Sequence, residues 1–234
     1  MEELETIFQQ GSEQVSGRLR VDMTTGMAKN IIIPRLPEFL SKHPKLDVQL
    51  SSTDRKVDLI REGFDCVVRV GTLNDSSLIA RPLGELKLIN CASPAYLKTY
   101  GIPKTLDDLA KHQLIHYVPI FGAKSSGWEY WDGAMNTNLN MPGVLTVNNG
   151  EAYEAACLAG LGLIQASEIG VRHHIQQGRL VEVLSDYLAA PMPISLLYAN
   201  RRHLSKRIRV FMDWVAEVLR EYLECPVFDN DISF

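Results

Sequence analysis

The sequence predicts an α/β protein built of two consecutive Rossmann-like lobes. Short apolar strands alternate with amphipathic helices twice along the chain, and the changeover between the two series falls near residues 80–90. In the first series, the apolar run at residues 66–68 is typical of a strand that a parallel sheet buries on both faces. A chain of 234 residues, 46% of them hydrophobic, is long enough to form the cores of two such lobes.

The first lobe is expected to begin with a strand and a long helix. Residues 19–23 alternate with period two, which indicates a strand, and an apolar helical stretch follows the break at 24–26. Four apolar side chains of that stretch share one helix face: Ile32, Leu36, Phe39 and Leu40. Pro34 and Pro37 each remove a backbone donor, so we expect the helix either to bend there or to begin close to Pro34.

The remaining elements repeat this alternation. Strand 48–50, helix 57–61 (closed by Gly63) and strand 66–70 complete a βαβαβ series, which indicates a parallel sheet. The expected strands of the second series lie at residues 86–92, 114–117, 143–147, 163–165, 180–183 and 194–198. Its expected helices begin after Ser93 and Thr105 and cover residues 149–159, 167–177 and 204–223, and loops are expected at 122–127 and 133–140.

The order of the elements divides the chain into segments. Residues 1–15 have the pattern of the end of a helix, and we assign residues 16–84 to lobe 1 and residues 85–198 to lobe 2. The C-terminal segment, about residues 199–225, is expected to return to lobe 1. The chain then crosses between the lobes twice, and two lobes joined in this way can hinge.

Composition and charge argue against several classes of protein. The formal charge of −4 gives no positive excess that would hold the whole chain on a phosphate backbone. No apolar stretch approaches the roughly 20 residues of a membrane span, and the acidic start does not resemble a signal peptide. The four cysteines lie far apart and are expected to be reduced: Cys66, Cys91, Cys157 and Cys225. These features predict a cytoplasmic protein.

The sequence contains no recognisable catalytic or metal-binding pattern. There is no G-x-S-x-G, no Walker A, no H-E-x-x-H, and no G-x-G-x-x-G after a strand. The pair His173-His174 has no cysteine or carboxylate nearby at metal-ligand spacing, so we interpret it as part of a solvated helix face. We therefore expect no catalytic residue, no cofactor and no metal, and we do not expect an enzyme.

Polar side chains instead follow the strands of both lobes. In open parallel sheets, ligands bind just outside the carboxyl ends of the strands, where helix N-termini offer free N–H groups. The residues expected there, and proposed to bind a ligand, are Thr24, Thr25, Thr53, Arg69, Val70, Asn148, Asn149 and Gln165. His203, near the exit of strand 194–198, is a weaker candidate. Such a cleft would suit a small polar molecule, plausibly an anion such as a carboxylate.

Each of these residues also has a purely structural interpretation. Thr25 and Asn149 could be helix N-caps, and Gln165 could satisfy backbone groups in a turn. Arg69 could pair with a nearby carboxylate such as Asp65. The basic segment at residues 201–209 is better explained as a solvated helix face than as a nucleic-acid site.

Five stretches of the sequence, in order, resemble the effector-binding domain of LysR-type transcriptional regulators. They are S-G-R-L-R-V at 16–21, the helix 33–40 ending at His43-Pro44, the D-x-x-x-x-G-x-x-D step within 57–65, S-S-L-I-A-R-P-L-G at 76–84, and A-G-L-G-L-I at 159–164. The resemblance covers about residues 16–222. One departure is Gln165-Ala166, where many members of the family carry proline.

The resemblance implies a fold like that of type II periplasmic binding proteins, with an effector cleft between the lobes. It implies that residues 2–15 end a linker helix, and that promoter DNA is bound only through an N-terminal winged helix-turn-helix absent from this chain. It also implies a homodimer, with a tetramer when full length, in which helix 28–43 lies against helix 150–160 of a partner. The interface residues expected from this are Ile32, Leu36, Ala155, Ala156 and Leu158, which could alternatively pack in the core of one chain.

The function predicted from the sequence is therefore that of a sensor. A small-molecule effector in the cleft would change the angle between the lobes, and the dimer would transmit that change to DNA-binding domains. One alternative is a solute-binding protein of a transporter with the same fold. Another is an enzyme that uses the same cleft, for which the sequence offers no acid–base or nucleophile pair.

Overall fold

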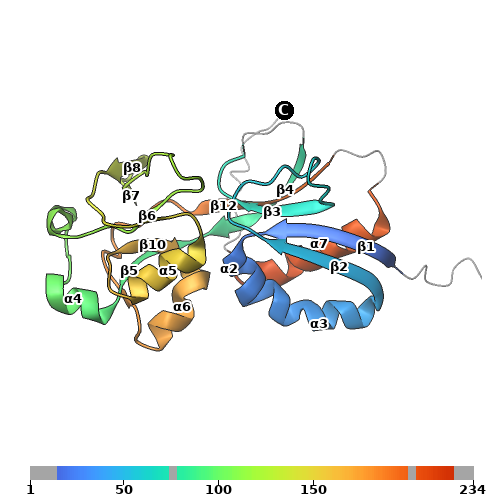
Figure 1. The fold of residues 1–234 in the computed structure, drawn as a ribbon, viewed down its shortest axis with the longest axis horizontal. Coiled ribbons are helices and arrows are strands. Elements are labelled where there is room, and N and C mark those ends of the chain that lie inside the picture. The colour runs from blue at the N-terminus through green and yellow to red at the C-terminus, as the bar shows by residue number, and fades with distance from the viewer. Residues whose placement is uncertain (1–14, 74–77, 200–203, 224–234) are drawn as a thin grey trace, which may run out of the picture.

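The sheet of lobe 1 contains five strands in a mixed order. The computed structural model describes residues 15–73, 78–199 and 204–223. In lobe 1 the strand order is β2-β1-β3-β12-β4 (Figure 1). The bounds are β1 Ser16–Met23, β2 Lys45–Ser52, β3 Cys66–Val70, β4 Leu78–Leu86 and β12 Met192–Ala199. Strand β1 runs parallel to β2 and β3, as the βαβαβ pattern predicts, whereas β12 runs antiparallel to β3 and β4.

The long helix of lobe 1 runs without interruption through residues 25–42. It consists of α2 (Thr25–Met27), a π-helical segment (Ala28–Ile32) and α3 (Ile33–Lys42). Pro34 lies in the first turn of α3, directly after the π-helical segment and Ile33, so the regular α-helical hydrogen-bond pattern is already interrupted where its N–H group is missing. The two prolines therefore do not end the helix, and the wider π-helical turns immediately precede Pro34.

The helix predicted at residues 57–61 is wrong. This segment forms turns, in which Phe64 N–H bonds to the carbonyl of Leu59 and Gly63 N–H to that of Ile60. This pair of bonds is the arrangement that ends a helix at a glycine in the left-handed region, and Gly63 has φ +71°. The sequence thus located the end signal correctly, but five residues are too few to add regular helix before it.

Lobe 2 is less parallel than the sequence indicated. Strand β5 (Leu88–Ala92) is antiparallel to both of its neighbours, β10 (Ile164–Ser167) and β11 (Val181–Glu182). The parallel pairs are β6 (His116–Tyr117) with β9 (Thr146–Val147), and a single bridge between Leu114 and Leu163. Strand β5 follows β4 after one residue as the chain enters lobe 2, so its direction is set in lobe 1 and not by a local βαβ connection.

The helices of lobe 2 match the predicted ones, with caps at the expected residues. They are α4 (Pro94–Tyr100), α5 (Gly150–Leu158) and α6 (Glu168–Gln176), while the segment after Thr105 is a 3-10 helix, Leu106–Lys111. Side chains accept the capping hydrogen bonds: Ser93 from the N–H of Tyr96 at 3.4 Å, and Asn149 from that of Ala152 at 2.8 Å.

A β-hairpin lies where the sequence suggested mostly loops. Strands β7 (Trp128–Trp131) and β8 (Asn136–Leu139) pair antiparallel, and Trp128 is completely buried. The turn is stabilised by Asp132, whose carboxylate accepts the N–H groups of Ala134 and Met135 at 2.9 Å. Glycines and asparagines on both sides of these short strands hid the alternation that identifies a strand.

The cores of the two lobes are formed separately. In lobe 1, α7 (Lys206–Arg220) packs against β1 and β4 with Phe211 and Val215 fully buried. Both faces of β3 are covered, because Val68 and Val67 belong to different apolar clusters.

Three of the cysteines are buried free thiols, and burial raises the pKa of the Cys66 thiol, whereas Cys225 lies outside the described residues. Within the described ranges, no helix has both the length and the apolar character of a membrane span.

Candidate functional site

A cavity of about 390 Å³ lies between the two lobes. Lobe 1 contributes the first turns of the long helix, including Thr24, Gly26 and Lys29. Lobe 2 contributes the facing parts of α5 and α6, and α2 contacts α5 across the boundary (Figure 1). A volume in this range is typical of small-molecule sites.

One carboxylate connects helix N-termini from both lobes. Asp54 accepts the Thr25 N–H at 2.9 Å with Oδ1 and the Gly150 N–H at 2.5 Å with Oδ2. Thr25 begins α2 in lobe 1 and Gly150 begins α5 in lobe 2, so a single side chain satisfies free donors at two positive helix ends. Sequence reasoning missed Asp54, although it directly follows the polar end of β2 at Ser52-Thr53.

Two predicted ligand-binding residues of lobe 1 are engaged with each other through a buried aspartate. Arg69 donates from Nη1 to Asp22 at 2.9 Å, and the Thr53 hydroxyl donates to the same carboxylate at 3.1 Å. The side chain of Asp22 is fully buried and that of Arg69 is 12% exposed. Arg69 therefore has a carboxylate partner, but the partner is Asp22 and not Asp65, which accepts the Arg20 N–H instead.

Gln165 lines the cavity with its amide group already fully used. Its Oε1 accepts the Glu129 N–H at 2.7 Å, and its Nε2 donates to the Glu129 carbonyl at 2.7 Å and to Asn90 Oδ1 at 2.9 Å. These bonds attach β7 to β10. The geometry matches the structural interpretation of Gln165, because its side chain satisfies backbone groups.

The other predicted residues lie in three different situations. Thr24 and Val70 line the cavity. Asn149 caps α5, and its Nδ2 donates to Asn148 Oδ1 at 3.4 Å, next to the part of α5 that lines the cavity. His203 lies outside the described residues. The structure thus gathers Thr24, Val70 and Gln165 around one space, while Thr25, Thr53, Arg69, Asn148 and Asn149 have hydrogen-bond partners beside it.

The charged residues that line this cavity are mostly acidic. Among the described residues, Lys29 faces the four carboxylates of Asp54, Glu129, Glu151 and Glu154. Lys29 is itself paired with Glu151 at 3.0 Å, across the boundary between the lobes. This lining does not favour the anionic ligand that the sequence suggested, because added negative charge would be repelled.

The cavity also offers neutral hydrogen-bonding groups. Tyr117 lines it, and burial raises the pKa of this phenol to about 12, so the hydroxyl stays protonated at neutral pH. Ser125 and Ser167 lie in the same lining. A ligand could therefore be oriented by hydroxyl groups without a charge of its own.

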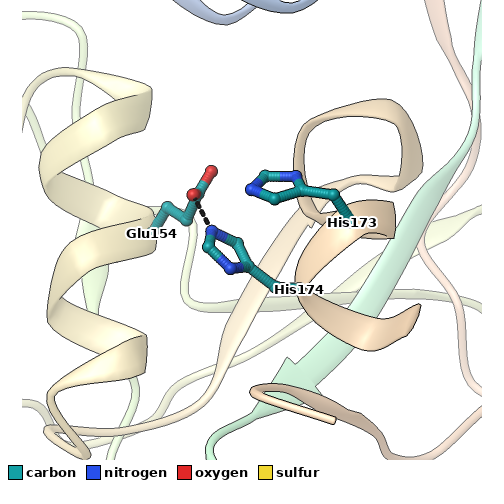
Figure 2. A group of neighbouring side chains, drawn as sticks. All are labelled: Glu154, His173 and His174. Carbon is teal, nitrogen blue, oxygen red and sulfur yellow. Dashed lines mark hydrogen bonds and ion pairs between the residues drawn. The ribbon is translucent and has the colours of Figure 1, made fainter. Parts of the chain in front are cut away.

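A cluster of possible metal ligands lies in the wall of lobe 2. Figure 2 shows Glu154 of α5 beside His173 and His174 of α6, with a hydrogen bond between Glu154 and His174 Nε2. The sequence-based interpretation of the two histidines as a solvated face is wrong for His174, which is 4% exposed. Its carboxylate partner lies 20 residues earlier in the chain, a separation that local spacing does not reveal.

The residues expected at a dimer interface are only partly on the surface. Ile32 and Ala156 are buried in the cores of lobe 1 and lobe 2, so their side chains present almost no surface to a partner. Leu36 and Leu158 are half-buried and Ala155 is exposed. Helix periodicity identified the apolar side of each helix. It could not distinguish the residues that are buried in the core from those at the margin of that side, which stay partly exposed.

Fold and cavity together define a two-lobed, ligand-binding α/β domain. The chain belongs to the family whose model is described as the LysR substrate binding domain, which matches residues 12–220. It is the effector-binding domain of a LysR-type regulator, with the type II periplasmic-binding-protein-like fold of such regulatory domains.

Individual relatives support the assignment. The chain is 46% identical to the HTH-type transcriptional regulator YhjC of Escherichia coli over 96% of this chain and 75% of that protein. It is 32% identical to an HTH-type transcriptional repressor of Pseudomonas aeruginosa, over 94% and 70% of the two chains. The regulatory domain of CrgA from Neisseria meningitidis superposes with a TM-score of 0.76 at 28% identity, covering 87% of this chain and 98% of that one. These relatives are transcriptional regulators, so a transporter's solute-binding protein is not favoured.

Proposed function

We propose that this domain senses a small molecule in the inter-lobe cavity and transmits its presence as a change in the angle between the lobes. The observation that carries the proposal is the Asp54 carboxylate, which joins helix N-termini of both lobes beside the cavity. A ligand shifts the balance between two lobe angles only if it binds one of them more tightly. The two hydrogen bonds of Asp54 stabilise the observed angle between the lobes. A ligand that touches both lobes can add to these hydrogen bonds or replace them.

The lining supports a neutral or positively charged ligand. Four carboxylates line the cavity with a single lysine that is already paired, and the other polar lining groups include the hydroxyls of Tyr117, Ser125 and Ser167 and the amides of Asn30 and Gln165. Apolar side chains such as Leu114, Val171 and Met192 also line the space. We therefore expect a small molecule with an apolar part and one or two hydrogen-bonding groups, bound and released without chemical change.

The proposal includes two partners beyond the effector. A homodimer is supported by apolar surface on α3 and α5, where Ile33 is 50% exposed and Ala155 is exposed beside Leu158. A tetramer follows from the family resemblance alone. Promoter DNA would be bound in the cytoplasm by a winged helix-turn-helix N-terminal to this domain, since the net charge of −4 gives this chain no positive excess that would hold it on a phosphate backbone.

A cavity-filling variant tests the proposal. Gly26 lines the cavity, and a Cβ atom added there meets nothing within 4 Å, so Gly26→Leu adds volume without a clash at the backbone. We expect a thermal-shift screen of neutral, cationic and anionic metabolites to find a stabilising ligand for the wild type. A ligand at 100 times its Kd stabilises by about 2.7 kcal/mol, and Gly26→Leu should abolish that shift.

The matched control places the same side chain far from the cavity. Lys98 is exposed on α4, at the opposite end of lobe 2, and Lys98→Leu should leave the ligand response unchanged (Figure 1). An equal response in Gly26→Leu and wild type would show that the ligand binds elsewhere and would contradict the proposal.

A further inference from the structure

The Glu154 cluster brings together three side chains that bind transition metals. Glu154 comes from α5, and His173 and His174 are consecutive on α6, yet one ligand atom from each lies within 4.8 Å of the others. In Figure 2 both imidazole rings lie beside the Glu154 carboxylate, and the two ring centroids are 3.8 Å apart. Two imidazoles and a carboxylate form the donor set of many zinc sites that keep an open position.

The spacing of the donors needs little adjustment. Donors bound to one tetrahedral ion at about 2.1 Å lie roughly 3.4 Å from each other, about 1.4 Å closer than the 4.8 Å within which the three ligand atoms lie here. His173 is exposed and lines the cavity, so its ring can rotate without disturbing a core. His174 and Glu154 already contact each other through a hydrogen bond, and a metal ion would replace the proton that they share, with the two atoms moving apart.

The two imidazoles differ in their surroundings. His173 is exposed and lines the cavity. His174 is almost fully buried, and its Nδ1 atom has no hydrogen-bond partner within the part of the chain that the structure describes. The contact with Glu154 is made by the other ring nitrogen, Nε2, so Nδ1 is not a ligand of the proposed site. The Glu154 carboxylate supplies negative charge beside both rings.

We propose that Glu154, His173 and His174 form a binding site for a divalent transition-metal ion such as Zn²⁺, with its free coordination positions directed to the inter-lobe cavity. Imidazole with carboxylate suits Zn²⁺, Ni²⁺ and Co²⁺ better than Mg²⁺ or Ca²⁺, which prefer oxygen ligands alone. Glu154 and His173 both line the cavity, so a bound ion would be accessible from it. All three ligands belong to lobe 2, and the site does not depend on the identity of an organic effector.

Metal titration of the purified, chelator-treated domain tests the site. We expect one Zn²⁺ per chain by isothermal titration calorimetry, and visible absorption bands of tetrahedral Co²⁺ when cobalt replaces zinc. Glu154→Gln and His173→Ala should each weaken Zn²⁺ binding at least tenfold, since each removes one ligand of three. Both residues retain solvent contact, so these variants should fold, whereas His174→Ala would open the core.

Two controls remove the same chemical groups elsewhere. Glu168→Gln removes a carboxylate of α6 that pairs with Arg172, and His43→Gln removes a histidine beyond the end of α3. Both should bind Zn²⁺ like the wild type. Binding that is absent in the wild type, or equal in Glu154→Gln and the controls, would overturn the site. A ligand response that survives in Glu154→Gln would still support the organic effector, so the two proposals fail independently.

Discussion

Lobe 1 and lobe 2 use their polar residues near the cleft in different ways. In lobe 1, Arg69 and Thr53 both donate to the buried Asp22 carboxylate, Arg69 Nη2 has no hydrogen-bond partner among the described residues, and neither Arg69 nor Asp22 lines the cavity. In lobe 2, Glu151 and Glu154 project from α5 into the cavity wall. Polar residues at strand ends therefore do not mark a binding site by themselves, because a partner inside the same lobe can remove them from it.

The largest expected effect concerns the buried pair of lobe 1. Asp22→Ala leaves the Arg69 guanidinium, 12% exposed, without its counter-charge, and breaking a buried pair in this way costs about 3–5 kcal/mol. Urea denaturation of the domain should show this loss in the free energy of unfolding. The double variant Asp22→Ala, Arg69→Met should recover part of it. A loss below about 1 kcal/mol would mean that the pair is solvated and that the contrast between the lobes is overstated.

The bridge between the lobes should have an intermediate effect. Asp54→Ala removes the acceptor of two helix N-terminal N–H groups, and loss of such a cap costs about 1–2 kcal/mol. Because one bond is made in each lobe, the variant should also have a larger radius of gyration by small-angle X-ray scattering. Asp54→Asn keeps one acceptor oxygen and serves as the conservative comparison. Unchanged scattering in Asp54→Ala would show that other contacts set the angle.

The smallest expected effect is that of the exposed ion pair across the same boundary. Lys29 and Glu151 are 65% and 49% exposed, and pairs in this situation contribute less than about 1 kcal/mol. Lys29→Met should lower the unfolding free energy by no more than about 0.5 kcal/mol and leave the scattering unchanged. A larger effect would place this pair with Asp54 among the contacts that hold the lobes together.

Patterns along the sequence identified most of the elements and their order, but not the turns at residues 57–61 or the β7–β8 hairpin. The caps at Ser93 and Asn149, the apolar run of β3 and the amphipathic C-terminal helix each depend on neighbours a few residues apart, which a sequence displays directly. The direction of β5 was not accessible in this way, since it is inherited from β4 in the other lobe. A local sequence pattern predicts local structure, whereas the direction of the strands in lobe 2 depends on how the chain enters from lobe 1.

The candidate site was predictable only in outline. Its position between the lobes follows from the order of the elements, but its chemistry depends on distant pairs. Arg69 binds Asp22, 47 residues away, and not Asp65, four residues away. Glu154 meets His174 only because α5 and α6 pack side by side, and Asp54 meets Gly150 across 96 residues. Such pairings decide which polar groups are free for a ligand.

The unbroken helix at residues 25–42 has a mechanical consequence. At 1.5 Å per residue it forms a rod about 27 Å long, whose first N–H group bonds to Asp54 and whose last turns carry α3 away from the cleft. A displacement of the first turn of this helix is transmitted along its backbone to the last turn. The helix can bend most easily at the π-helical turns before Pro34. Events beside the cavity and events on the outer surface of lobe 1 are thereby connected through continuous backbone, without an intervening loop.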